Sequence, residues 1–98
     1  MQISPINIGP ITNASGSANN GLPATAFSIA SGNVYAMIQN ISSVDMYLGI
    51  NFAPSLINGI LLKANGGAIE FNGGFIPSGT YYLWANSTTN SPYTALYA

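Results

Sequence analysis

The sequence has very few of the side chains that carry chemistry. It contains no cysteine, no histidine and no arginine, and its only charged side chains are those of Lys63, Asp45 and Glu70. Without cysteine there is no disulfide framework and no thiolate metal site. General acid–base catalysis, a serine or cysteine triad and a histidine or carboxylate metal cage also need groups that are absent. We therefore expect a protein that is not an enzyme and that holds no cofactor and no metal.

Charge is scarce over the whole chain. Charged residues make up 3% of the sequence, and the formal net charge is −1, whereas a globular sequence is about 25% charged. One lysine cannot neutralise a nucleic-acid backbone, so we expect no nucleic-acid partner. Low charge also protects poorly against association. Either Asn, Ser, Thr and Gly keep the protein soluble, or its working state is an assembly, and we favour the assembly.

Long hydrophobic runs are missing as well. No apolar stretch approaches the roughly 18 residues of a membrane span. The first residues show no basic region followed by an apolar one, so we expect no signal peptide and synthesis in the cytoplasm. The chain is nevertheless 48% hydrophobic and 11% aromatic, which is not the composition of a disordered protein. Its 98 residues suffice for one domain with its own core.

Short apolar runs alternate with Asn, Gly and Ser about every ten residues, and no segment keeps a helical apolar period without a glycine or proline. This pattern predicts an all-β fold, a small antiparallel β-sandwich or jelly-roll-like barrel. Simple alternation places Thr25, Phe27 and Ile29 on one face of their strand. Residues 13–23 are rich in small polar groups and are expected to form a loop. The expected strands are residues 24–30, 34–41, 45–51, 60–62, 68–72, 80–86 and 93–97.

Residues 1–12 are predicted to form an extended N-terminal arm or edge strand, because Pro5 and Pro10 prevent a central strand. Residues 13–98 then form the single β-sandwich domain. Apolar side chains of the arm and of the loop at residues 52–58 are candidates for burial against partner subunits. The interface hypothesis names Ile3, Ile6, Ile8, Ile11, Phe52, Leu56 and Ile57.

Aromatic side chains support a second hypothesis, in which rings stack on sugars and neighbouring amides bind sugar hydroxyls. Tyr81, Tyr82 and Trp84 are its candidate residues. The plainer interpretation is that these aromatics fill a sheet core or the edge of an interface. The three charged side chains leave a similar choice open, between one ion pair and solvated surface charges.

A series of short motifs runs through residues 34–85. They are I-Q-N-I-S-S at 38–43, M-Y-L-G at 46–49, N-G-I-L-L at 58–62, G-G-A-I-E-F at 66–71 and Y-Y-L-W-A at 81–85. This series resembles a group of small β-proteins encoded by tailed bacteriophages. The chain departs from that group in its very low charge and its longer N-terminal arm.

The resemblance implies a β-sandwich virion component without catalytic residues, such as a capsid decoration or head-fibre base protein. We therefore expect a structural virion protein that self-associates and binds the major capsid protein or another virion subunit. A homo-oligomer is expected, with a trimer as the first stoichiometry to test. The alternative is a carbohydrate-binding module on a virion or cell surface.

Overall fold

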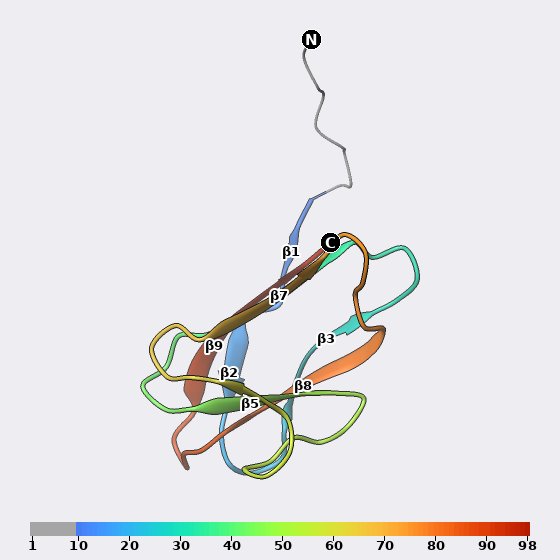
Figure 1. The fold of residues 1–98 in the computed structure, drawn as a ribbon. Coiled ribbons are helices and arrows are strands. Elements are labelled where there is room, and N and C mark those ends of the chain that lie inside the picture. Colours follow the sequence, from blue (N-terminus) through green and yellow to red (C-terminus); the bar gives the residue numbers. More distant parts are fainter. Residues whose placement is uncertain (1–9) are drawn as a thin grey trace.

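Two antiparallel β-sheets form the fold, as predicted (Figure 1). The computed structural model describes residues 10–98, and these contain strands but no helix. The described part of the chain accordingly has no helix that is long and apolar enough to cross a membrane. The strands are β1 (Thr12–Asn13), β2 (Gly16–Ala18), β3 (Ala24–Ile29), β4 (Tyr35–Asn40), β5 (Met46–Ile50), β6 (Ile60–Leu62), β7 (Ala68–Asn72), β8 (Gly79–Ala85) and β9 (Ser91–Tyr97).

The strand pairing is nested. In the first sheet β1 and β2 both pair with β9, which pairs with β4, which pairs with β7; the second sheet has the order β3-β8-β5-β6. The chain thus pairs β2 with β9, β3 with β8, β4 with β7 and β5 with β6. Such a long hairpin, wrapped into one five-stranded and one four-stranded sheet, has the connectivity of a jelly roll. The β-sandwich prediction is confirmed, and the pairing specifies its jelly-roll form.

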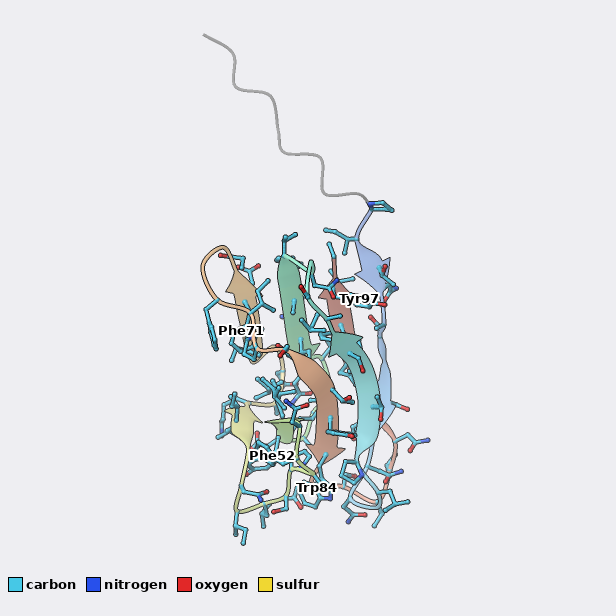
Figure 2. All side chains as sticks on the ribbon, turned by 90° about the vertical axis from the view of Figure 1, so that its right-hand side faces the viewer. Phe52, Phe71, Trp84 and Tyr97 are labelled. Atoms are coloured by element: carbon cyan, nitrogen blue, oxygen red, sulfur yellow. The ribbon has the colours of Figure 1, made fainter. Side chains whose placement is uncertain are left out.

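The core lies between the sheets and is built by alternation along the strands. Along β8, Tyr81, Leu83 and Ala85 are buried while the residues between them are only partly covered. The Tyr81 ring packs against Phe27 with ring centroids 4.8 Å apart, and against Phe71 of β7. Figure 2 shows Phe71 on β7 and Tyr97 on β9, the two core-flanking aromatics of the first sheet.

The expectation of a loop at residues 13–23 is wrong, because β1 and β2 lie partly within it. These strands gain their order from main-chain pairing with β9, to which the small side chains contribute little. The ring of Tyr93 covers Gly16 so closely that a β-carbon there would lie 3.1 Å from the Tyr93 hydroxyl oxygen. Gly16, one of the small residues that suggest a loop, is therefore favoured by packing within a strand.

Strand β3 also departs from simple alternation. Ala24 pairs with Leu83 and Phe27 with Tyr81, so β3 has one residue more than β8 between these pairs, and the register shifts. This β-bulge turns Thr25 to the exposed outer face while Phe27 and Ile29 stay in the core. The prediction that all three share one face is wrong for Thr25.

A buried asparagine joins two connections at one end of the sandwich. The Asn40 amide nitrogen donates to the carbonyl oxygens of Val44 (2.7 Å) and Leu62 (2.9 Å). Its side-chain oxygen accepts from the main-chain nitrogen and the hydroxyl of Ser42. Asn40 is fully buried, and all its hydrogen-bonding groups have partners. The N-x-S segment at 40–42 is thus a structural clasp that holds β4, the start of β5 and the end of β6 together.

Candidate interaction surface

The charged side chains of the described residues occur at most in pairs. In residues 10–98 no three metal-ligating side chains come together, and the described surface contains no pocket. Lys63 lies 3.5 Å from Asp45, whose other carboxylate oxygen accepts from the main-chain nitrogen of Ala64. This ion pair is partly exposed, and such a pair contributes about 0–1 kcal/mol. Two of the three charged side chains therefore form an ion pair, which lies at the surface.

Glu70 has a separate polar setting. Its carboxylate accepts hydrogen bonds from the Tyr35 hydroxyl (2.8 Å) and the Asn72 amide (2.9 Å). The hydrogen bond to Glu70 raises the pKa of Tyr35 above its usual value near 10, and burial and the carboxylate charge act in the same direction. Burial also raises the pKa values of Tyr81 and Tyr93. All three tyrosines therefore stay neutral to a higher pH than a free tyrosine does.

The connection between β5 and β6 presents large apolar side chains to solvent. Ser55 and Asn58 form an isolated β-bridge, with two main-chain hydrogen bonds and a 2.9 Å contact between their side chains. Leu56 and Ile57 occupy the two central positions of this tight turn, where Gly, Pro, Asn, Asp and Ser are usual. Ile57 is 94% exposed and Leu56 53%. The turn holds two large aliphatic side chains in water on a fixed main chain.

Close packing anchors this connection to the outer face of the second sheet. Pro54 is buried against Gly49, where an added β-carbon would lie 2.9 Å from the Pro54 ring and would also meet the Phe52 carbonyl oxygen. Gly59 has a φ of 125°, and a β-carbon there would lie 2.9 Å from the Leu48 carbonyl oxygen. Two glycines thus let the segment lie directly on β5.

Asn51 ties the start of the same connection to β8. Its amide donates to the Ser78 carbonyl oxygen (2.9 Å) and accepts from the Thr80 nitrogen (3.0 Å). The Asn51 main-chain nitrogen also donates to the Thr80 carbonyl oxygen. Asn51 has a φ of 66°, a left-handed conformation that asparagine tolerates better than most residues. The segment leading to the apolar turn is therefore fixed at both of its ends.

We call the apolar area formed by this connection and β6 the β5–β6 surface. Each of its side chains is at least 40% exposed, and none is charged. Ile60 and Leu61 belong to β6, which is one edge of the second sheet. Leu61 lies on the outer face, whereas Ile60 pairs with Leu48 and lies on the other face of this edge strand. Leu61 pairs with Tyr47, which in turn pairs with Trp84, so the outer face continues as an aromatic row. The β5–β6 surface consists of Phe52, Leu56, Ile57, Ile60 and Leu61.

The sequence hypothesis names three members of this surface and misses two. Phe52, Leu56 and Ile57 belong to the connection that leads into β6, whose exposed residues Ile60 and Leu61 the sequence suggests only as a strand. The position of β6 at a sheet edge leaves them uncovered, and edge position is not visible in a local pattern. Ile11 of the predicted arm is 55% exposed just before β1. Ile3, Ile6 and Ile8 lie outside the described residues.

The three sugar-binding candidates do not share one face. Tyr81 points into the core and its hydroxyl donates to the Pro77 carbonyl oxygen (2.7 Å). Tyr82 and Trp84 alternate with it and lie half-buried on the outer face of the second sheet. Figure 2 shows Trp84 at the end of β8 in the same lower part of the molecule as Phe52. The outer face therefore keeps two of the three candidates, beside the β5–β6 surface.

Comparisons of the chain with protein-family models, with curated proteins and with solved structures found no match. The resemblance of residues 34–85 to small phage-encoded β-proteins therefore stays a prediction.

Proposed function

We propose that this chain is a non-enzymatic structural protein of a virion, which self-associates and attaches to the capsid surface in a decoration or cement role. It would be made in the host cytoplasm and act on the particle, with the major capsid protein or another virion subunit as partner. The observation that carries this proposal is the rigid turn that presents Leu56 and Ile57 to solvent. A monomer with no partner gains nothing from fixing large aliphatic side chains in water.

The jelly-roll fold is consistent with the proposal. Jelly rolls occur in viral capsid proteins, and also in lectins and cupins. A fold does not imply a function, so the weight falls on the surface. That surface offers apolar contact area and almost no charge, as an assembly module requires.

The mechanism is the burial of apolar surface between subunits. Fully burying a Leu or Ile side chain stabilises a complex by about 1.5–3 kcal/mol, at about 25 cal/mol per Å². Several such side chains offset the entropy lost on association. Because charges contribute little, attachment is expected to resist salt, which screens charge–charge interactions but not apolar contacts.

The carbohydrate-binding alternative has less support. Of its candidates only Tyr82 and Trp84 face outward, and the surface of residues 10–98 offers a glycan no pocket. Small-molecule sites are usually concave, with a few polar groups placed to orient the ligand. A glycan-array screen tests this alternative directly: binding that is lost in Trp84→Ala would favour it over the virion role.

The virion proposal is tested by isolating particles from a culture that produces the chain. The proposal predicts that the chain sediments with intact particles in a density gradient and stays with them at high salt. Mass spectrometry of the particle fractions provides the measurement, with the major capsid protein as internal standard. Absence of the chain from purified particles, with the chain present in the soluble fraction, would contradict the proposal.

A further inference from the structure

We infer that the β5–β6 surface is the contact between copies of this chain, which face each other through this same surface around a rotational axis. This inference deepens the proposed function, because it assigns one surface of the module to self-association. It rests on three observations: the charge of the surface, its area and its rigidity.

The charge of the surface favours a second copy as its occupant. The five side chains of the β5–β6 surface are all uncharged and apolar. The nearest charges along the strands are Asp45 and Lys63, which compensate each other at 3.5 Å. When a charged surface binds a second copy of itself, like charges come close together, and their repulsion weakens the contact. This surface carries no net charge to repel its copy.

The area is close to what a stable contact needs. Five large side chains that are 40–94% exposed present on the order of 500 Å² of apolar surface, if each has about 200 Å² when free. An apolar patch of about 300–600 Å² is the largest on a typical monomer and is often functional. A standard interface buries about 800 Å² on each partner. The adjoining Tyr47 and Trp84, which are partly exposed, bring the surface closer to that size.

The rigidity of the turn lowers the cost of association. Asn51, Gly49 and the bridge between Ser55 and Asn58 hold the main chain in place before any partner arrives. Binding therefore orders little additional chain, and preorganisation of this kind increases affinity. Ile57 is the most exposed of the five side chains, and when two copies meet through the same surface each copy uses the same residue. One substitution thus acts on every subunit of the assembly.

A matched pair of variants tests the inference. Ile57→Asn changes the surface, whereas Leu22→Asn changes an equally exposed aliphatic side chain (92% against 94%) in the connection before β3, at the opposite edge of the same sheet. We expect Ile57→Asn to weaken self-association at least about tenfold, the effect of removing one buried large apolar side chain. Leu22→Asn should leave it unchanged within about twofold. Light scattering over a dilution series gives the masses, and thermal melts confirm that both variants fold.

Thiol labelling supplies a second readout that does not depend on weakening the assembly. The chain has no cysteine, so Ile57→Cys and Leu22→Cys each carry a single thiol. In the assembled state a maleimide should react with Ile57→Cys at least about tenfold more slowly than with Leu22→Cys, and equally fast after dilution to monomers. Equal labelling in a stable oligomer would overturn the inference, as would an Ile57→Asn variant that assembles normally. A wild-type chain that stays monomeric would also overturn it, while sedimentation with particles tests the proposed function independently.

Discussion

At the residue scale, a few polar and small residues determine the shape of the surface. Asn40 is fully buried and forms hydrogen bonds with four backbone or side-chain groups. Asn51, at the surface, forms side-chain hydrogen bonds with Ser78 and Thr80. Gly49 is required because Pro54 lies on it. Each of these residues holds in place a strand or connection that carries the apolar side chains.

Replacing Asn40 by Ala should destabilise the fold by about 2–4 kcal/mol, because the carbonyl groups of Val44 and Leu62 lose their donor in a buried setting. Urea unfolding followed by tryptophan fluorescence provides the measurement. Asn90→Ala is the control, since Asn90 is exposed and bonds only to Asn19 at the surface. It should change the free energy of unfolding by less than about 0.5 kcal/mol. Equal effects of the two substitutions would show that Asn40 does not hold these segments together.

Gly49→Ala should destabilise the protein by about 1–3 kcal/mol, because the added methyl group displaces Pro54 and Phe52 from the outer face of β5. Self-association should weaken in parallel, since the apolar turn loses its support. Gly74→Ala serves as the matched control, because no atom lies within 4 Å of the β-carbon that it adds. A Gly49→Ala variant as stable as Gly74→Ala would show that the segment does not lie on β5.

At the scale of elements, the connection between β5 and β6 is the part that local sequence patterns describe least well. Its strands were predictable, because Met46 and Leu48 alternate with Tyr47 and Gly49. The tight turn within the connection was not predictable, because Leu56 and Ile57 at its centre are unusual turn residues. The polar residues that close it, Ser55 and Asn58, flank them in the sequence. A glycine within a strand can mark close backbone approach, which is the signal that Gly49 offered.

The same limit explains the two misassigned segments. Strand β2 consists of small residues, and its order comes from pairing with β9 more than seventy positions away. The bulge at Thr25 depends on the register between β3 and β8, which alternation within β3 does not reveal. By contrast, the strands expected at residues 34–41 and 80–86 are present as β4 and β8. Local patterns thus predicted strands, while long-range pairing determined edges and register.

Asn51 allows a test of how this connection is held. Asn51→Ala loses the side-chain bonds to Ser78 and Thr80 and also places an alanine at a φ of 66°. Asn51→Gly loses the same bonds without the backbone strain. We expect both variants to be less stable than wild type, with the alanine variant about 1 kcal/mol below the glycine variant. Chemical denaturation compares them, and equal stabilities would mean that the left-handed conformation is not maintained.

At the scale of the whole molecule, the surface carries few charges, and the core contains the tyrosines Tyr81 and Tyr93. The pKa values of Tyr35, Tyr81 and Tyr93 are raised in the folded state. A raised tyrosine pKa stabilises the fold fully below the unfolded value near 10, and this stabilisation is lost as the pH rises through the folded pKa. The protein should therefore lose stability at alkaline pH.

Thermal melts between about pH 8 and about pH 11 measure this loss, because the unfolded tyrosines ionise near pH 10. Wild type should melt at a clearly lower temperature at the alkaline end. Tyr35→Phe should reduce the difference, because it removes the hydroxyl that donates to Glu70. A melting temperature that does not change up to about pH 11 would contradict the assigned hydrogen bond and burial.

The central claim is that this chain is an apolar assembly module, and its mass in solution tests that claim most directly. Light scattering should be carried out at about 0.1 M and about 1 M salt, between which the Debye length falls from about 10 Å to about 3 Å. We predict a stable oligomer of the same mass at both concentrations, because the contact uses apolar side chains and no net charge. A monomer at both salt concentrations, or an oligomer that dissociates at high salt, would contradict the claim.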